Sequence, residues 1–408
     1  MAAKQTYVIV GANLCGGRAA ETLRKAGFDG RLLLIGAEPD RPYERPPLSK
    51  EYLRRKVERE SVFLRPPEFY DEQEIEMRLA VRVTGIDVRD RSLELDGGER
   101  LGFDKLLIAT GGRVRRLPVA GAELQGVYYL RTIADSEAIA AQLVAGGRVV
   151  VIGAGFIGAE VAASARMSGL EVTLLEVPDV PLGRALGSEM GGIYAEIHRE
   201  QGIDLRLGTG VDRLEGTGRV KRVVTSRGDF IDCDLVVVGV GMEPEIDLAV
   251  GAGIETGNGI IVDEYCRTSV EGIFAAGDVA SFPNPILGER MRVEHWANAQ
   301  NQGVAAAKAM LGMAEPYAEV PWFWSDQYDL NMQYVGHASA WDEVVLRGDV
   351  AGRRFTAFYL KDGRLRAAMA LNRPRDVSAS RTLIRTATPV TAQQLRDEDV
   401  ALRALLPA

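Results

Sequence analysis

The stretch Gly11-Ala12-Asn13-Leu14-Cys15-Gly16 and its later counterpart Gly153-Ala154-Gly155-Phe156-Ile157-Gly158 decide the fold of this 408-residue chain. Each stretch lies between a Val/Ile-rich run, typical of a buried strand, and an apolar run of helical character. Glycines in such a turn let the backbone approach a pyrophosphate at the N-terminus of a helix. One such pattern is a weak signal, but two in the full strand, turn and helix context predict two Rossmann-like units and two bound dinucleotides.

A glutamate after the next predicted strand supports both units. Residues 31–35 run towards Glu38, and residues 171–175 run directly into Glu176. An acidic side chain at this place accepts hydrogen bonds from ribose hydroxyls. Glu176 is followed by Val177, Pro178 and Asp179, without a basic pair to neutralise a 2′-phosphate, which favours NADH over NADPH.

Asn13 stands where the first fingerprint is expected to have its second glycine. Of the common residues, asparagine tolerates positive φ best after glycine, so we expect positive φ at Asn13 and a phosphate loop that still functions. The alternative for either motif is that its glycines serve only to pack a helix tightly on a sheet. The repetition makes that alternative the weaker explanation for the pair.

Composition excludes several classes of function. The chain has 49 Lys and Arg against 57 Asp and Glu, a formal charge of −8, which argues against a general binder of nucleic acid or of anionic membranes. The N-terminal residues run into the first predicted strand without an apolar signal or spanning segment, so we expect a cytoplasmic protein.

Cysteine and histidine usage exclude other chemistries. Cys15, Cys233 and Cys266 are far apart and form no Cys-x-x-Cys pair, which removes a dithiol relay and an internal iron–sulfur cluster. The three histidines have no metal-ligand spacing, so no metal site is expected.

Later segments complete the predicted organisation. A strand at 105–109 ends in Thr110-Gly111-Gly112, and a strand at 233–238 ends in a similar turn that contains Gly241. The run 272–279 is interpreted as a return to the first unit. From about residue 318 the alternating aromatic and apolar pattern predicts an antiparallel sheet with helices.

Four further motifs carry a family resemblance. The chain resembles the two-dinucleotide flavoprotein disulfide-reductase superfamily and, within it, the NADH-dependent ferredoxin reductases that serve bacterial oxygenases, of the putidaredoxin reductase and biphenyl dioxygenase reductase type. The resemblance covers almost the whole chain. The motifs are Pro42-Tyr43-Glu44-Arg45-Pro46-Pro47-Leu48-Ser49-Lys50, Tyr129-Leu130-Arg131-Thr132, Arg292-Val293-Glu294-His295-Trp296-Ala297-Asn298-Ala299 and Pro321-Trp322-Phe323-Trp324-Ser325-Asp326-Gln327-Tyr328.

The resemblance implies an α/β fold like that of glutathione reductase, with two Rossmann-like dinucleotide-binding domains and a C-terminal α+β domain. The implied FAD domain is discontinuous, at residues 1–112 and 242–318. An NADH domain at 113–241 is inserted in it, and residues 319–408 form the C-terminal domain.

The resemblance also implies roles for individual residues. Lys50 would lie beside the isoalloxazine, where a fixed cation favours the anionic reduced flavin. Glu160 would lie near the nicotinamide and pair with Lys50, and Trp324 would border the same pocket. Without the resemblance, Lys50 would be interpreted as a solvated surface lysine, Glu160 as an exposed or salt-bridged helix residue, and Trp324 as a core or interface aromatic.

Besides Lys50, the implied FAD residues are Gly11, Asn13, Leu14, Cys15, Gly16, Glu38, Val83, Ala109, Thr110, Gly111, Arg131, Gly277, Asp278, Glu294, His295 and Trp296. The implied NADH residues are Gly153, Gly155, Phe156, Ile157, Gly158, Glu160, Glu176, Arg184 and Gly241.

The implied activity is electron transfer from NADH through FAD, one electron at a time, to a small [2Fe–2S] ferredoxin that feeds a cytochrome monooxygenase or a Rieske dioxygenase. We expect a monomer whose basic face near the flavin, with Arg65, Arg292 and Arg373 as candidates, meets an acidic ferredoxin. Three alternatives stay open: an NADH oxidase or peroxidase, a rubredoxin reductase, and a redox-sensing NADH-binding flavoprotein resembling apoptosis-inducing factor.

Overall fold

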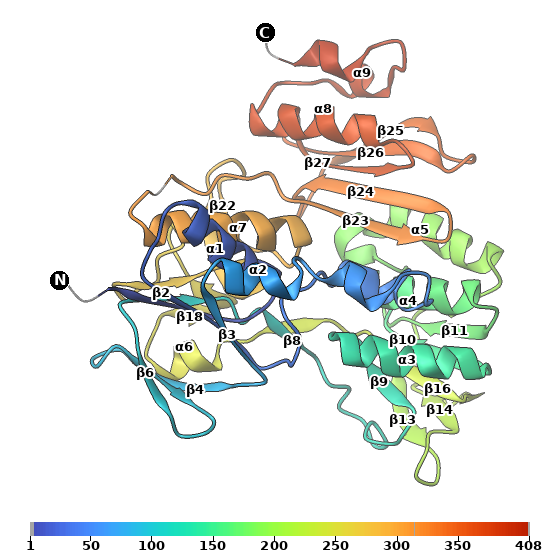
Figure 1. The fold of residues 1–408 in the computed structure, drawn as a ribbon. Helices are drawn as coiled ribbons and strands as arrows, with labels where there is room; N and C mark the ends of the chain where they lie inside the picture. Colours follow the sequence, from blue (N-terminus) through green and yellow to red (C-terminus); the bar gives the residue numbers. More distant parts are fainter. Residues whose placement is uncertain (1–3, 314, 407–408) are drawn as a thin grey trace.

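The computed structural model describes residues 4–313 and 315–406. Two five-stranded parallel sheets carry the two glycine fingerprints, and a five-stranded antiparallel sheet follows them (Figure 1). This arrangement confirms the predicted fold class. The domain bounds given above stay a prediction.

The first sheet is built from segments far apart in the sequence. Its last strand, β20, comes from beyond the second unit and pairs with β7, which confirms the predicted return of the chain. In spatial order the strands are β20 (Ile273–Ala275), β7 (Lys105–Ile108), β1 (Thr6–Val10), β2 (Arg31–Gly36) and β3 (Ile75–Leu79).

Both faces of this first sheet are buried, which explains why its strands read as continuous apolar runs. Ile9 and Leu34 face a cluster built with helices α1 (Leu14–Lys25) and α7 (Trp296–Met310), which pack side by side in Figure 1. Val8 and Leu33 face the opposite core. Small sheets there are β4 (Val83–Asp87), β5 (Ser92–Leu95) and β6 (Arg100–Gly102), and β18 (Thr256–Gly257), β19 (Gly259–Ile261), β21 (Ala280–Asn284) and β22 (Glu289–Arg292), beside helix α6 (Asp247–Gly251).

The second sheet repeats the same plan around the later fingerprint. Its strands are, in spatial order, β12 (Asp204–Arg206), β11 (Glu171–Leu175), β10 (Arg148–Ile152), β16 (Leu235–Val238) and β9 (Val127–Tyr129). Its helices are α3 (Ile133–Ala145), α4 (Phe156–Met167) and α5 (Gly183–Glu200), and a side sheet has β13 (Val211–Glu215), β14 (Arg222–Thr225) and β15 (Phe230–Asp232). The antiparallel pair β8 (Gly112–Val114) and β17 (Met242–Pro244) carries the chain between the two units.

The third sheet and the second unit share one hydrophobic core. Leu186 and Met190 of α5 belong to the same buried cluster as Phe355 and Tyr359 of the third sheet. The sheet strands are β23 (Trp322–Gln327), β24 (Leu330–Gly336), β27 (Arg364–Leu371), β26 (Arg354–Lys361) and β25 (Glu343–Asp349), followed by helices α8 (Pro374–Arg385) and α9 (Ala392–Arg396). The predicted antiparallel sheet with helices is therefore confirmed.

The Pro-rich segment between β2 and β3 is a loop with short helices. They are η1 (Pro46–Ser49), η2 (Arg59–Val62) and α2 (Pro67–Glu72), and η1 contacts α4 of the second unit. Among the residues that the structure describes, no helix is both long enough and apolar enough to cross a bilayer.

A kink in α5 fits this helix to the third sheet. Gly187 has φ +79, outside the helical region, and a Cβ atom there would lie 2.5 Å from the Trp341 ring. The Tyr359 hydroxyl donates a hydrogen bond of 2.9 Å to the carbonyl oxygen of Leu186, the residue before the kink. The kink thus needs both the backbone freedom of glycine and its small volume.

We expect Gly187→Ala to destabilise the protein by about 1–3 kcal/mol, because alanine strains at this φ and clashes with Trp341. Gly192→Ala is the matched control in the same helix, since a Cβ atom at Gly192 meets nothing within 4 Å. That control should be neutral or stabilising by up to about 1 kcal/mol. Denaturant unfolding of the two variants is the measurement, and equal midpoints would contradict the prediction.

Candidate functional site

The first phosphate turn is shaped by close backbone contacts. Gly11 has φ +123, and a Cβ atom there would lie 2.2 Å from the carbonyl oxygen of Ala109. A Cβ atom at Gly16 would lie 2.0 Å from the carbonyl oxygen of Gly11. Both glycines are therefore required for helix α1 to start directly against the sheet.

Asn13 does not take the backbone conformation that the sequence predicted. Its φ is −121, so the expectation of positive φ was wrong. Asn13 is instead the N-cap of α1: its side-chain oxygen accepts a 3.2 Å hydrogen bond from the Gly16 amide, and its side-chain amide donates to Ala109 at 2.6 Å. Asparagine is favoured here as a cap, which satisfies a free helix amide, and not for its tolerance of left-handed backbone.

The second turn has the same geometry with more open space. Gly153 has φ +98, and a Cβ atom at Gly158 would lie 1.9 Å from its carbonyl oxygen. A Cβ atom at Gly155, by contrast, meets nothing within 4 Å. The fingerprint therefore combines two glycines needed for packing with one that leaves room above the helix N-terminus, where an anion is favoured.

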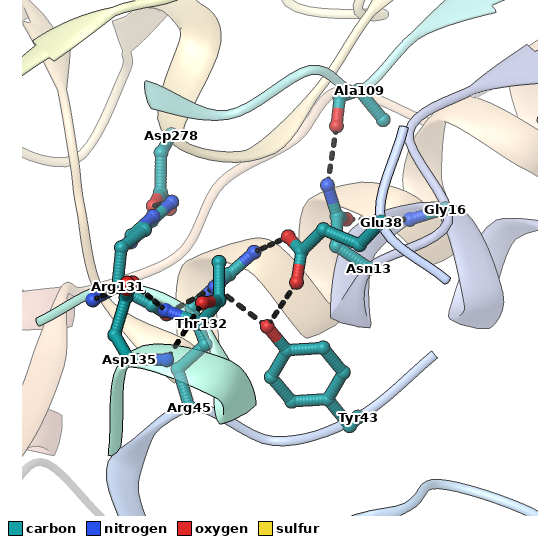
Figure 2. Close-up of polar contacts among 10 residues, drawn as sticks. All are labelled: Asn13, Gly16, Glu38, Tyr43, Arg45, Ala109, Arg131, Thr132, Asp135 and Asp278. Atoms are coloured by element: carbon teal, nitrogen blue, oxygen red, sulfur yellow. Dashed lines mark hydrogen bonds and ion pairs between the residues drawn. The ribbon is translucent and has the colours of Figure 1, made fainter. Parts of the chain in front are cut away.

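Glu38 anchors a polar cluster beside the first turn (Figure 2). Its carboxylate accepts a 2.7 Å ion-paired hydrogen bond from Arg45 and a short one from the Tyr43 hydroxyl. Burial by itself would raise the pKa of Glu38, but the Arg45 charge and the Tyr43 hydrogen bond outweigh it, so the pKa is lowered and the carboxylate stays ionised. Arg45 also donates to the Tyr43 hydroxyl and to the carbonyl of Arg131.

Arg131 and Asp278 extend this cluster. Their side chains lie 3.5 Å apart, and the Arg131 Nε atom is buried without a hydrogen-bond partner in the structure. Asp278 belongs to the short helix η3 (Gly277–Val279) that follows β20. Figure 2 shows how Asp135 holds the Arg131 segment by accepting from two backbone amides, those of Arg131 and Thr132. A buried, unsatisfied guanidinium donor beside a helix N-terminus fits an anionic ligand.

Lys50 and Glu160 form a buried ion pair, with Nζ and Oε2 2.8 Å apart. The Ser49 hydroxyl donates to the same Oε2, and the Ser325 hydroxyl donates to Oε1 at 2.7 Å. Lys50 follows η1, Glu160 lies on α4, and Ser325 lies on β23. All three units of the fold therefore meet at one carboxylate.

Aromatic side chains gather at the same junction. Trp324 packs edge-on to Trp296 at 5.7 Å between ring centroids and stacks with Trp322 at 5.3 Å. Phe323 contacts Phe156 of the second fingerprint at 4.8 Å and His295 at 4.4 Å. Strand β23 thus reaches both predicted dinucleotide sites.

His295 is half-buried, and desolvation of its ring together with the nearby His337 lowers its pKa to about 3, so the ring is neutral. Its Nδ1 atom has no hydrogen-bond partner in the structure. This polar atom is a second unsatisfied group among the residues assigned to FAD by resemblance.

Other predicted residues surround this core of the site. Glu176 accepts hydrogen bonds from the backbone amides of Ala154 and Val177, which places its carboxylate at the second fingerprint. Thr110 donates to the carbonyl of Glu245, and Gly111 and Gly241 have φ +72 and +98. The Gly277 amide donates to Gln302, and Glu294 pairs with Arg292.

Two predicted residues lie farther from these contacts. Val83 begins β4, and the nearby Ala80 amide donates to the carbonyl of Glu38. Arg184 is exposed on the first turn of α5, next to Leu182, whose amide donates to Ala154 of the fingerprint. Leu14 and Ile157 complete the set, Leu14 buried at the start of α1 and Ile157 exposed on α4.

Sequence reasoning assigned no role to Tyr43, Arg45, Ser49 or Ser325. All four belong to quoted family motifs, so the motif itself was the available signal. Their partners lie on segments distant in sequence, and pattern alone does not reveal such contacts.

The cysteines are buried thiols. Burial raises the pKa of Cys15, Cys233 and Cys266, so none is a ready thiolate. Cys15 packs against the glycines of α7 and η3: a Cβ atom at Gly303 would lie 2.5 Å from its carbonyl oxygen. Within residues 4–313 and 315–406, no group of three or more His, Cys, Asp or Glu side chains is arranged to hold a metal ion.

Comparison with known proteins agrees with this architecture. A family model described as "pyridine nucleotide-disulphide oxidoreductase" matches residues 5–303, and one described as "reductase C-terminal" matches residues 322–406. The chain belongs to the pyridine nucleotide-disulphide oxidoreductase family.

Individual relatives match over nearly their whole length. Rhodocoxin reductase of Rhodococcus erythropolis is 43% identical over 98% of this chain and 93% of its own. The ferredoxin–NAD(+) reductase component of the anthranilate 1,2-dioxygenase system of Burkholderia cepacia is 43% identical over 98% and 99%. The solved putidaredoxin reductase, in covalent complex with putidaredoxin, matches with a TM-score of 0.96 at 37% identity over 99% and 98%. These matches confirm the family resemblance inferred from the motifs.

Gly155 and Gly158 offer a test of the second fingerprint. We expect Gly155→Val to fold with an unchanged thermal midpoint, because its Cβ position is open, yet to lose NADH affinity by at least about tenfold, because the branched side chain fills the space above the helix N-terminus. Gly158→Ala should instead lower the thermal midpoint. Isothermal titration with NADH and thermal unfolding separate the two effects, and full NADH affinity in Gly155→Val would contradict the assignment.

Proposed function

We propose that this chain is an NADH-dependent ferredoxin reductase that holds FAD in its first Rossmann-like unit and receives NADH in the second. The observation that carries the proposal is the buried Lys50–Glu160 pair, which joins the loop after β2 of the first unit to the fingerprint helix α4 of the second. A fixed cation at the junction of two dinucleotide sites suits hydride transfer between two cofactors. The relatives' names, ferredoxin–NAD(+) reductase and putidaredoxin reductase, support a ferredoxin as the electron acceptor.

The residues at the first site fit FAD. Glu38 is ionised and positioned to accept hydrogen bonds from ribose hydroxyls, with Arg45 and Tyr43 orienting its oxygens. The unsatisfied Nε of Arg131 and the open amides of α1 are donors for a pyrophosphate. Asp278, at the end of β20, would accept from the ribityl hydroxyls.

The second site suits NADH better than NADPH. Glu176 points its carboxylate at the Ala154 amide of the fingerprint, where a ribose would lie, and a carboxylate there repels a 2′-phosphate.

Bound flavin supplies the conversion between two-electron and one-electron transfer that links a nicotinamide to an iron–sulfur protein. The protein's own residues position the reactants and control charge. Lys50 places a positive charge at the junction, and Glu160 holds that charge in place at 2.8 Å. Trp296 and Trp324 give the pocket an apolar wall, which excludes water and strengthens the electrostatic effect of Lys50.

The three candidate arginines for ferredoxin docking differ in how far neighbouring carboxylates already neutralise their charge. Arg292 and Arg373 are largely occupied, Arg292 by Glu294 and Arg373 by Asp376 and Glu398. Arg65 is partly exposed and shares Glu21 with Arg18 and Lys25, so three cations surround one carboxylate and leave a net positive patch. We therefore assign the docking face to the Arg65 patch, defined as Arg18, Lys25 and Arg65.

The alternatives have less support. Cys15 is buried with a raised pKa, so it does not suit the single redox cysteine of an oxidase or peroxidase. A redox-sensing flavoprotein would differ in turnover, and kinetics distinguish it.

We expect NADH to bleach the flavin rapidly in anaerobic stopped-flow measurements, NADPH to do so much more slowly, and an oxidised [2Fe–2S] ferredoxin added afterwards to reoxidise it. The physical reason for the cofactor preference is the Glu176 carboxylate. The contrary outcome is slow bleaching that leaves a persistent long-wavelength charge-transfer band, which ferredoxin does not remove. That outcome would contradict the reductase function and favour the redox-sensor function.

Electrostatic steering by the Arg65 patch predicts a salt effect on one half-reaction only. Ferredoxin reduction should slow several-fold between low and physiological ionic strength and again in Arg65→Gln, whereas flavin reduction by NADH should not change. Arg100→Gln, an exposed arginine on β6, is the matched control. Identical salt dependence in the wild type and Arg65→Gln would remove the patch from the docking face.

A further inference from the structure

Glu160 has an uneven set of donors. Its Oε2 atom accepts from Lys50 and from Ser49, whereas the structure gives Oε1 a single side-chain donor, the Ser325 hydroxyl at 2.7 Å. Glu160 is only 3% exposed, so water is a poor substitute for any of these donors. The orientation of the carboxylate therefore depends on a residue of the C-terminal sheet.

Ser325 is itself held in one orientation. It is 1% exposed on β23, and its backbone pairs with Met332 of β24. The side-chain amide of Gln327 donates to Ser325 Oγ at 3.2 Å. A serine hydroxyl has one proton, so with its oxygen accepting from Gln327 that proton is directed at Glu160.

The charged groups around Glu160 determine how a lost hydrogen bond to its carboxylate affects Lys50. Lys50 is the cation bonded to Glu160, and the Glu160 charge also acts on the buried Tyr194, which Asp326 faces as well. The negative charge of a buried carboxylate must be stabilised by its hydrogen-bond donors and its ion-pair partner. When the hydroxyls supply less of that stabilisation, the Lys50 ammonium group supplies more. The more firmly Glu160 binds Lys50, the less of that positive charge acts on a neighbouring anion.

We infer that Ser325 is a positioning residue: through Glu160, it determines how strongly the Lys50 charge acts on the reduced flavin ring. The inference rests on the proposed function, because it takes the flavin to lie beside Lys50. It also makes the C-terminal sheet a contributor to the electron-transfer site, beyond the apolar contact that Trp324 provides.

The test begins with Ser325→Ala. Glu160 then relies more on Lys50, so the flavin midpoint potential should become more negative and the rate constant of flavin reduction should fall by about three- to tenfold, with the NADH dissociation constant unchanged. Ser136→Ala is the matched control. Its hydroxyl is equally buried and donates at 2.8 Å to Leu48 of η1, but it does not touch Glu160, so the potential should not move.

A double-mutant cycle separates positioning from general damage. In a Glu160→Gln background, Ser325→Ala should no longer shift the potential, because the group through which it acts is gone. An unchanged potential in Ser325→Ala, or an equal shift in the Glu160→Gln background, would overturn the inference.

A measurement on the flavin-free protein keeps this inference separate from the proposed function. In infrared spectra the carboxylate stretching band assigned by Glu160→Gln should shift in frequency in Ser325→Ala relative to the wild type, because one hydrogen bond to the carboxylate is lost. If NADH fails to reduce the wild-type flavin, the proposed function fails even where this band shifts. If the band does not shift, the inference fails even where the enzyme is active.

Discussion

The structure depends on a buried charge that no single unit of the fold can satisfy. Glu160 lies on the fingerprint helix of the second unit, its cation Lys50 comes from the first unit, and its remaining donors come from Ser49 and Ser325. Removing one partner from a buried ion pair leaves an uncompensated charge, which costs about 3–5 kcal/mol. The three units are thereby constrained to meet at one place, and that place lies between the two predicted dinucleotide sites.

Glycine contacts set the geometry on either side of this pair. In both units the last fingerprint glycine lies where a Cβ atom would be 2.0 Å or less from the carbonyl oxygen of the first, so each helix begins against its sheet. The units differ at the middle position. Gly155 leaves open space, whereas Asn13 caps its helix with a side chain turned back to the sheet. The two units therefore share one backbone arrangement but differ in the open space above the N-terminus of the fingerprint helix.

The sequence predicted the parts of the fold that depend on local pattern. Apolar runs located β1, β2 and β7 of the first parallel sheet and β10, β11 and β16 of the second, and the return of β20 to the first sheet followed from the run 272–279. The shorter or more polar strands β3, β9 and β12 were not predicted. Asn13 shows a limit, because the same residue type suits both a left-handed turn and an N-cap, and only the surrounding backbone decides. Ser325 shows another, because a serine in an aromatic strand motif carries no sign of a carboxylate 165 residues away in sequence.

The sequence pattern predicts the fold of the C-terminal sheet but does not reveal what the sheet contributes to the site. Its alternating pattern predicts an antiparallel sheet, and the shared core with α5 explains why it stays fixed to the second unit. The same strand, β23, then places Phe323 against Phe156 and Ser325 against Glu160, on two consecutive turns of α4. A sheet rigidly joined to the second unit and bonded to its fingerprint helix holds that helix in register with Lys50. Packing in this C-terminal core is thus coupled to the geometry of the charge pair.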